Sequence, residues 1–479
     1  MFQQLYQILS PAAILISDEE VRPYECDGLS VYTERPGVVV IPNTLEEVKA
    51  ILQFCYTHQI PLVTRGAGTS LSGGALPHKE GVLLSLAKFN RILKIDPVSR
   101  TAKLEPGVRN LAISQAAAQY NLYYAPDPSS QIACTIGGNV AENAGGVHCL
   151  KYGLTVHNIL EVKVLTITGD WLTIGSQAGD TPGYDLLALM TGSEGLLGVI
   201  MEITVKLLPK PEQVRVLLAA FHEVTTASSA VADIIATGII PAGLEMMDNA
   251  AIRAAEDFVK VGYPVTAAAI LLCELDGHND EVDQQLQQVF SVLEHAGAYE
   301  VRLAQDEQQR LQFWAGRKSA FPAVGRISPD YYCMDGTIPR RHLAKVLQQI
   351  SELSQQYRLA VANVFHAGDG NLHPLILFDA NQAGELQRAE EFGGKILELC
   401  VEVGGTITGE HGVGIEKLNQ MCIQFNTAEL NQFHRIKAAF DPTGLLNPHK
   451  AIPTLHRCAE FGAMHVHHGH LRFPQLERF

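Results

Sequence analysis

The stretch Arg65-Gly-Ala-Gly-Thr-Ser-Leu-Ser-Gly-Gly74 decides the fold, because it is a glycine-rich loop directly after a short apolar strand expected at residues 61–64. Successive backbone N–H groups in such a loop converge on an anion-binding concavity. The loop is not a Rossmann fingerprint, since Leu71 stands where the third glycine is required, and no lysine completes a Walker A pattern. The stretch therefore predicts a phosphate cradle of another kind. Its polar side chains suit a pyrophosphate: Arg65, Thr69, Ser70 and Ser72.

Two more loops of small residues follow in the same region. Residues 126–146 are dense in Gly, Asn, Ser and Pro, and Thr191-Gly-Ser-Glu-Gly-Leu-Leu-Gly198 forms another small-residue turn. Taken alone, each loop could be a surface turn. Three of them in one region predict a ligand that combines phosphates with a large planar ring.

Hydrophobic patterning around these loops predicts an α+β protein. Thr44 and Glu47 form a capping-box pattern ahead of a helix, between strands expected at 38–42 and 61–64. Beyond the linker 209–211, strands alternate with amphipathic helices, which is typical of an antiparallel sheet covered by helices. We expect strands at 82–86, 159–168, 199–208, 214–221, 267–275, 361–365 and 374–378, and helices at 110–120, 227–237, 280–297, 340–357, 383–402 and 428–440.

Composition narrows the class of protein. The 479 residues are 47% apolar and 18% charged, as in a well-buried globular protein of two or three domains. A net charge of −15 argues against nucleic-acid binding. With no bilayer-length apolar run and no basic leader, we expect a cytoplasmic protein that reaches a membrane only through a partner. Nine scattered cysteines predict reduced thiols and no iron–sulfur cluster, so if the protein moves electrons, they must leave through another molecule.

Two polar clusters near the C-terminal end predict a catalytic site. They are His366-Ala-Gly-Asp-Gly-Asn-Leu-His373 and Gly409-Glu-His-Gly412. Two short strands joined by the Gly-Asp-Gly-Asn turn could aim His366 and His373 at one point, and with Glu410 they form a ligand set for Zn²⁺, Mn²⁺ or Fe²⁺. His411 remains for general-base chemistry. In an extended peptide, the side chains of Glu410 and His411 point to opposite sides.

The glycine loops resemble the FAD-binding domain of the vanillyl-alcohol-oxidase-type flavoproteins, through residues 65–74 and Ile136-Gly-Gly-Asn-Val-Ala-Glu-Asn-Ala-Gly-Gly146. The histidine clusters and the ending Asp441-Pro-x-Gly-x-x-Asn-Pro448 are similar to the 2-hydroxy-acid dehydrogenase branch. Within that branch the closest likeness is to the flavin subunits of bacterial glycolate oxidases. Stretches at 23–28, 123–131 and 328–335 carry it, together with the histidine-rich tail.

The resemblance implies a two-part FAD-binding domain of this type, an antiparallel-sheet α+β substrate (cap) domain, and a C-terminal segment that returns to the flavin. The expected limits are 1–35 for an N-terminal segment, 36–210 for FAD binding, 211–427 for substrate, 428–455 for the returning segment and 456–479 for the tail. FAD is expected to be noncovalent, because the first loop lacks the histidine that covalent members use. The expected FAD contacts are Arg65, Gly66, Ala67, Gly68, Thr69, Ser70, Ser72, Gly73, Gly74, Pro126, Asp127, Gly137, Gly138, Asn139, Asn143, Gly145, Gly192, Ser193, Gly195, Gly198 and Asn447.

The implied reaction is oxidation of glycolate to glyoxylate. A metal bound by His366, His373 and Glu410 polarises the substrate hydroxyl, His411 removes its proton, and the flavin takes the α-hydrogen as hydride. The resemblance assigns substrate binding to Arg317 and Asn371, although Arg317 could instead be a solvated helix charge. A lysine found near the position of Cys333 in relatives that act on larger diacids is absent, which favours a small substrate.

Three alternatives remain open at this stage. The first is a D-lactate or broader D-2-hydroxy-acid dehydrogenase. The second is a non-catalytic flavoprotein scaffold, and the third is a metallohydrolase, which would leave the flavin loops unexplained. The resemblance also implies a complex with a second FAD-type subunit and an iron–sulfur subunit, at the inner face of the plasma membrane. The tail histidines 456, 465, 467, 468 and 470 are expected to belong to a docking segment rather than a metal site.

Overall fold

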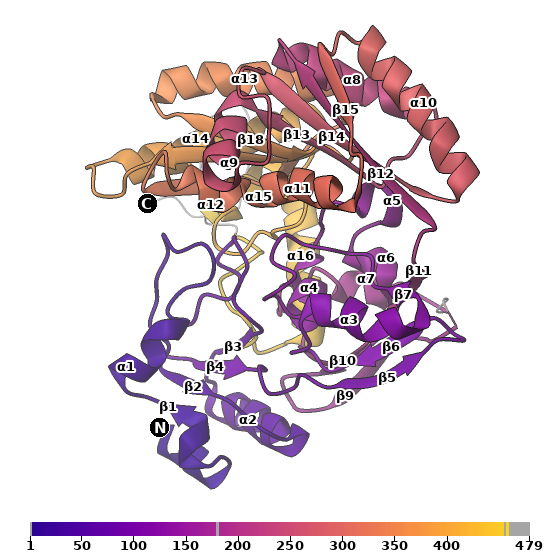
Figure 1. Ribbon diagram of the computed structural model, residues 1–479. Helices are drawn as coiled ribbons and strands as arrows, with labels where there is room; N and C mark the ends of the chain where they lie inside the picture. The colour runs from indigo at the N-terminus through magenta and orange to yellow at the C-terminus, as the bar shows by residue number, and fades with distance from the viewer. Residues whose placement is uncertain (1, 179–181, 455–456, 459–479) are drawn as a thin grey trace. The chain divides into compact units, whose positions relative to one another are not determined.

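The computed structural model describes residues 2–178, 182–454 and 457–458, and the chain divides into two compact units (Figure 1). Unit 1 comprises Met1–Gly145, Leu154–Pro209 and Glu410–Phe479, and unit 2 comprises Gly146–Gly153 and Lys210–Gly409. The tail histidines lie outside the described residues.

The first sheet of unit 1 is small and mostly parallel. Its order is β1 (Ile14–Leu15), β2 (Val38–Val40), β4 (Val82–Ser85) and β3 (Leu62–Arg65), and β2, β4 and β3 run parallel. Helix α2 (Leu45–His58) begins at the predicted Thr44–Glu47 capping box and buries one apolar face on the core of these strands. The glycine-rich loop leaves the carboxyl end of β3, where loops of parallel strands commonly bind ligands.

The second sheet of unit 1 is antiparallel. Its order is β5 (Ile92–Asp96), β6 (Thr101–Leu104), β10 (Val199–Lys206), β8 (Ile159–Leu165) and β9 (Trp171–Gly175). The apolar core on this sheet includes residues of α3 (Asn110–Ala117) and α4 (Ile136–Glu142), with α16 (Thr427–Phe440) packed at its margin. The two sheets are the two parts of the FAD-binding fold expected from the sequence.

Unit 2 is built on one eight-stranded antiparallel sheet. The order is β15 (Glu300–Leu303), β12 (Gln213–Phe221), β14 (Ala269–Gly277), β13 (Gly243–Asp248), β18 (Val361–His366), β19 (Asn371–Phe378) and β16 (Asp330–Cys333), and β17 (Gly336–Thr337) also pairs with β19. Every pairing is antiparallel, as the sequence predicted for the substrate domain.

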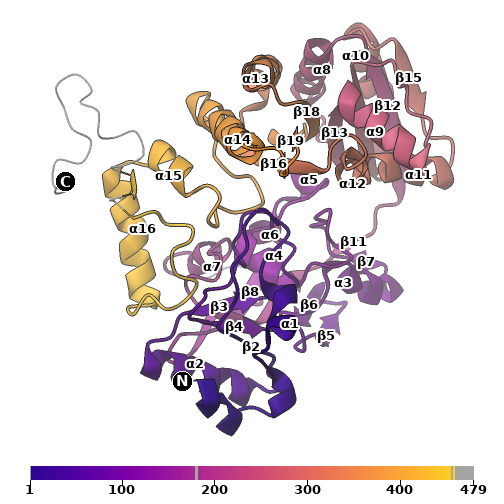
Figure 2. The ribbon, with the colours of Figure 1, turned by 90° about the vertical axis from the view of Figure 1, so that its left-hand side faces the viewer.

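Helices cover both faces of this sheet (Figures 1 and 2). One face carries α9 (Asn249–Val259), α11 (Glu307–Lys318) and α12 (Ala320–Val324), which share an apolar core with alternate residues of the strands. The other face carries α8 (Val224–Ala236), α10 (Asn279–His295), α13 (Leu343–Tyr357) and α14 (Glu385–Glu402). We call the face under α9, α11 and α12 the inner-helix face.

A short segment from the middle of the FAD-type sequence belongs to unit 2. Residues Gly146–Gly153 include α5 (Cys149–Tyr152), and they are held to β14. His148 Nε2 lies 2.9 Å from Glu274 Oε1, and the Tyr152 hydroxyl donates to Asp276 Oδ2 over 2.7 Å. Buried carboxylates on a central strand therefore hold a segment that precedes the strand by more than a hundred residues in sequence.

A disulfide and several secondary-structure elements, among them strand β13, differ from the sequence-based expectations. A disulfide joins Cys422 to Cys458, so the prediction that all nine cysteines are reduced is wrong for this pair. Strand β13 was not predicted, because nearly all of its residues are buried and helices cover both sides, which removes the alternation that identifies a half-buried strand. Among the residues that the structure describes, no helix combines the length and apolar character needed to cross a bilayer.

Candidate functional site

A hairpin of unit 2 presents the first histidine cluster on one face of the sheet. Strands β18 and β19 pair with His366 opposite Asn371 and Val364 opposite His373. Directly opposed residues share a face, and residues two apart on a strand do so as well. His366, Asn371 and His373 therefore all face the inner-helix side, the same side as Val364, which belongs to its core. The predicted convergence of the two histidines is present, with ring centroids 5.0 Å apart.

A buried carboxylate holds His366 from the neighbouring strand. His366 Nδ1 lies 2.7 Å from Glu245 Oε1, and both side chains are almost completely buried. Burial alone would raise the pKa of Glu245, but the attraction of His366 and Arg317 outweighs it and lowers that pKa. The carboxylate therefore accepts the hydrogen bond and His366 Nδ1 carries a proton, which leaves Nε2 as the nitrogen that offers a lone pair to a metal when the ring is neutral.

Arg317 completes this network from helix α11. Its Nε donates to Glu245 Oε2 over 2.7 Å, and its Nη2 lies 2.6 Å from the same oxygen. Only 1% of the surface of Arg317 is exposed. The alternative that Arg317 is a solvent-exposed charge on a helix is therefore wrong. Its guanidinium is paired with Glu245, a residue that no local sequence signal marked.

His373 is oriented in the same way by the backbone. Its Nδ1 lies 3.3 Å from the carbonyl oxygen of Met334, and a carbonyl can only accept a hydrogen bond. Nδ1 therefore carries the proton and Nε2 the lone pair, as in His366. Metal-binding histidines commonly donate their second ring N–H to a carboxylate or a backbone carbonyl, because this fixes the tautomer and the ring direction. The two histidines show one arrangement of each kind.

The second cluster follows directly on a residue that is anchored in unit 2. The Gly409 amide donates to Asp335 Oδ2 over 3.1 Å, and Glu410 and His411 are the next two residues of the chain. The chain bends here, and His411 Nε2 lies 3.9 Å from Glu410 Oε1. The peptide is therefore not extended at these two residues, so the opposite orientation that an extended peptide would give does not apply.

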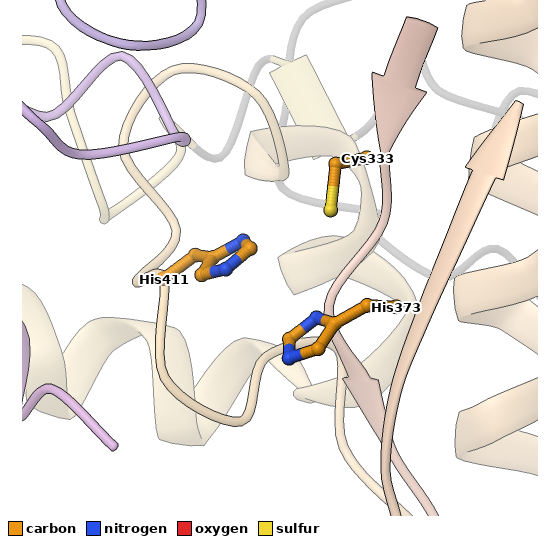
Figure 3. A group of neighbouring side chains, drawn as sticks. All are labelled: Cys333, His373 and His411. Atoms are coloured by element: carbon orange, nitrogen blue, oxygen red, sulfur yellow. The ribbon is translucent and has the colours of Figure 1, made fainter. Parts of the chain in front are cut away.

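Two groups of possible metal donors share His373. One is His366, His373 and Glu410, the set predicted from the sequence, and the other is Cys333, His373 and His411. Within each group the ligand atoms lie within 4.8 Å of one another. Figure 3 shows Cys333, His373 and His411 as neighbouring side chains. Nothing in the sequence indicated that Cys333 could bind a metal. Its thiol adds a soft donor to His373 and His411.

The three glycine-rich loops of unit 1 meet through hydrogen bonds. The Gly192 amide donates to Val140 O and the Glu194 amide to Ala141 O, both over 2.8 Å, which joins the third loop to α4. Asn447 Nδ2 donates to Gly74 O over 3.0 Å and to Glu194 O over 2.6 Å. Asn447 thus returns from the C-terminal segment to the first and third loops, so the segments predicted to share a ligand are adjacent.

These loops suit a phosphate-bearing cofactor. A Cβ on Gly66 would lie 2.3 Å from Thr135 Oγ1, so only glycine allows the first loop to approach the second this closely. Gly68 and Gly73 have φ values of +70° and +76°, which also favour glycine. Thr135 Oγ1 is buried, and within the described part of the chain it has no hydrogen-bond partner. The glycine cradle and this polar atom fit the dinucleotide that the sequence predicts.

Several predicted cofactor residues are occupied with structural contacts. Arg65 Nη1 donates to Cys26 O over 2.7 Å and faces Asp27, which links the first loop to the N-terminal segment. Asn139 Oδ1 accepts from Asn110, and Asn143 Oδ1 accepts from the Val156 amide. These side chains shape the loops, and the glycines and backbone groups are left as the main cofactor-facing elements.

Two buried acids at these loops were missed by the sequence analysis. Burial, reinforced by the charge of Glu194, raises the pKa of Glu142 well above its ordinary value. Glu194 accepts from the Val413 and Gly414 amides, both over 2.7 Å, and so binds the segment that follows His411. Both residues lie inside glycine-rich motifs, whose pattern predicts solvent-exposed loops. No local pattern predicts that these two side chains are buried.

The fold and loops define an FAD-linked oxidoreductase. Residues 36–175 match the family described as "FAD binding domain", and residues 210–451 match "FAD linked oxidases, C-terminal domain". The chain belongs to this FAD-linked oxidase family. Its fold is also that of p-cresol methylhydroxylase, a solved structure with a TM-score of 0.78 at 18% identity that covers 95% of this chain and 96% of that one.

Curated relatives refine this placement. The chain is 71% identical to the glycolate oxidase subunit GlcD of Escherichia coli (strain K12), over 97% of this chain and 93% of the relative. It is 32% identical to a D-lactate dehydrogenase of Anaerostipes hadrus, over 93% of this chain and 96% of that protein. Both likenesses extend over nearly the whole chain.

Proposed function

We propose that this protein is the flavin-bearing subunit of a glycolate-oxidising enzyme and converts glycolate, a small 2-hydroxy acid, to glyoxylate. The observation that carries the proposal is the pair His366 and His373, whose rings are 5.0 Å apart and whose Nδ1 atoms are both engaged by acceptors. The 71% identity to a glycolate oxidase subunit supports the choice of substrate. A scaffold without catalytic activity would have no need of this pair.

His366, His373 and Glu410 are the proposed ligands of a divalent metal, Zn²⁺, Mn²⁺ or Fe²⁺. A 2-hydroxy acid can chelate such an ion through its hydroxyl and one carboxylate oxygen. The bound ion supplies Lewis acidity that makes the hydroxyl proton easier to remove. Glu245 and Met334 O support the proposal, since they hold the two imidazoles in the tautomer that a metal requires.

The proposed FAD site is formed by residues 65–74, the 126–146 region, residues 192–198 and Asn447, with noncovalent attachment because the first loop lacks histidine. FAD supplies the two-electron acceptor for the hydrogen on the substrate carbon. We propose 36–210 as the FAD-binding domain, 211–427 as the substrate domain and 428–455 as the returning segment. The hydrogen bonds that Asn447 makes to the first and third loops support the role of the returning segment.

Residues of the chain supply the remaining proposed functions. His411 takes the proton of the substrate hydroxyl on a ring nitrogen. The Asn371 amide orients the substrate, and Arg317 adds positive charge that favours a carboxylate. The pairing of Arg317 with Glu245 reduces this charge, so the metal supplies most of the attraction. Position 333 holds a cysteine, and a single cationic site favours a substrate with one carboxylate.

The proposed enzyme passes its electrons to partner subunits. The sequence has no cysteine array for an iron–sulfur cluster, and the relative with 71% identity is itself named a subunit. We propose a complex with a second FAD-type subunit and an iron–sulfur subunit, in the cytoplasm or at the inner face of the plasma membrane through those partners.

Anaerobic reduction of the purified flavoprotein tests the proposal. Glycolate, D-lactate and D-2-hydroxyglutarate are added separately, and bleaching of the flavin absorbance is followed by rapid mixing. We expect the highest ratio of limiting rate to dissociation constant with glycolate. A preference for D-lactate would support the activity named for the Anaerostipes hadrus relative, and bleaching by none of the three acids would reject a catalytic role.

A further inference from the structure

Asp335 joins the β18–β19 hairpin to Gly409, the first residue of the second cluster, within unit 2. It lies between β16 and β17 and is completely buried. Its Oδ1 accepts from Asn371 Nδ2 over 3.1 Å, and its Oδ2 accepts from Thr408 Oγ1 over 2.6 Å and from the Gly409 amide over 3.1 Å. One carboxylate therefore holds both the β18–β19 hairpin and the end of the segment that leads into Glu410.

The contact with Asp335 determines which way the Asn371 amide faces. A carboxylate accepts hydrogen bonds, so the NH₂ group of Asn371 must face Asp335 and its oxygen must face away. Asn371 Oδ1 is buried, and among the described residues it has no partner. Asn371 lies on the same face of the hairpin as His366 and His373. Asp335 thus makes position 371 a hydrogen-bond acceptor beside the paired histidines.

The same carboxylate determines where the second cluster begins. A Cβ on Gly409 would lie 1.7 Å from Asn371 Nδ2 and 2.5 Å from Thr337 Oγ1, so the backbone is pressed against the hairpin. Consecutive Cα atoms are about 3.8 Å apart, so the Cα atom of His411 lies at most about 7.6 Å from the Cα atom of the anchored Gly409. The bonds from Thr408 and Gly409 to Asp335 therefore restrict Glu410 and His411.

We propose that Asp335 is a positioning residue, which sets the acceptor orientation of the Asn371 amide and the starting point of the Glu410–His411 segment. This inference rests on the proposed function, since it assigns Asp335 to the same site. Asp335 acts through Asn371 and Gly409 and does not contact the substrate.

An isosteric substitution isolates this role. In Asp335→Asn the new amide oxygen can still accept from Thr408 and Gly409, which leaves its NH₂ group toward Asn371. Two facing NH₂ groups repel, so the Asn371 amide turns over and presents a donor where it had presented an acceptor. In the double variant Asp335→Asn/Asn371→Asp, the new amide donates to the new carboxylate and position 371 is again an acceptor. The number of carboxylates is the same as in the wild type.

Three readouts on the FAD-loaded protein test the proposal: the limiting rate of anaerobic flavin reduction by glycolate, the dissociation constant of glycolate, and hydrogen exchange of residues 406–414. For Asp335→Asn we expect flavin reduction about 10- to 100-fold slower, weaker glycolate binding, and exchange about 5-fold faster, because a charge-assisted bond is lost. The double variant restores an acceptor at position 371 but places a carboxylate beside an anionic substrate, so we expect only partial recovery of the rate. Asp248→Asn is the control, since Asp248 is another aspartate of unit 2 whose carboxylate accepts from two backbone amides, those of Ala251 and Asn363.

The outcomes separate the positioning role from the function itself. Wild-type parameters in Asp335→Asn would overturn the positioning role. An equal loss of rate in Asp248→Asn would also overturn it, since the effect would then follow from general destabilisation. If no 2-hydroxy acid bleaches the wild-type flavin, the proposed function fails. The exchange measurement still tests the anchor in that case, and unchanged exchange at 406–414 would reject it.

Discussion

Replacing Glu245 by Gln separates two tasks that one buried carboxylate performs in unit 2. Glu245 pairs with Arg317 at 2.6 Å and accepts from His366 Nδ1 at 2.7 Å. Glutamine keeps the shape but has a single acceptor oxygen, so only one of His366 and Arg317 retains its acceptor. The negative charge is lost, which leaves the guanidinium of Arg317 without a counter-charge and makes the imidazole of His366 a weaker donor to metal.

Both effects have magnitudes that follow from burial. Arg317 and Glu245 are each 1% exposed, and removing one partner of a buried ion pair costs about 3–5 kcal/mol. In a domain of this size, that loss lowers the midpoint of thermal unfolding by roughly 10 °C. Loss of a carboxylate behind a metal-binding histidine costs about 10- to 100-fold in metal affinity. We therefore expect Glu245→Gln to be less stable and to bind Zn²⁺ more weakly.

The double variant Glu245→Gln/Arg317→Met distinguishes the two effects. It removes the uncompensated cation, so the unfolding midpoint should recover toward that of the wild type while metal affinity stays low. Thermal unfolding measures the first quantity, and competition with a chelator for Zn²⁺ measures the second. The surface pair Lys395–Glu398 provides a control, because Glu398→Gln should cost at most about 1 kcal/mol. Wild-type zinc affinity in Glu245→Gln would refute the role of Glu245 behind His366.

Three further predictions follow from the two units. Gly66→Ala should weaken FAD binding, because its Cβ would lie 2.3 Å from Thr135 Oγ1, and full flavin content after purification would contradict this expectation. His411→Ala should slow anaerobic flavin reduction by about 10²- to 10⁴-fold with little change in flavin content, and an unaffected rate would remove His411 from the mechanism. Burial raises the pKa of Asp248 to about 6, above the value near 3.9 of an unfolded aspartate, so the folded state binds the proton more tightly and loses stability as pH rises from about 4 to 6. The free energy of unfolding of Asp248→Asn should therefore rise by about 2 kcal/mol relative to that of the wild type between pH 4 and 7, and an unfolding midpoint difference that does not vary with pH would contradict this assignment.

Local patterns in the sequence were sufficient for most of the fold. The capping box at Thr44 and Glu47 marks the start of α2, and the strands of the substrate domain were predicted wherever apolar runs were bounded by turn residues. The glycine-rich loops were recognisable because glycine density is itself a local signal. Strand β13 was missed because a central strand covered on both faces shows no alternation.

The partners of the site residues could not be predicted from the sequence. Glu245 is 72 residues from Arg317 and 121 from His366, and Asp335 is 73 residues from Thr408. No periodicity extends over such separations, and each acid stands alone in an apolar or mixed stretch. The disulfide between Cys422 and Cys458 was missed for the same reason, since cysteine counts do not reveal proximity in the fold.

The register of the hairpin explains why the histidine cluster needs its intervening glycines. Moving β19 by one residue along β18 would turn His373 and Asn371 to the opposite face of the sheet, away from Glu245. Gly370 helps to prevent this shift, because its φ is +84° and a Cβ there would lie 2.1 Å from Ile338 O. The amide of Ile338 also donates to Gly370 O. The glycine between the histidines therefore fixes the register of the strands, and that register directs both imidazoles to the side of the sheet where Glu245 and Arg317 lie.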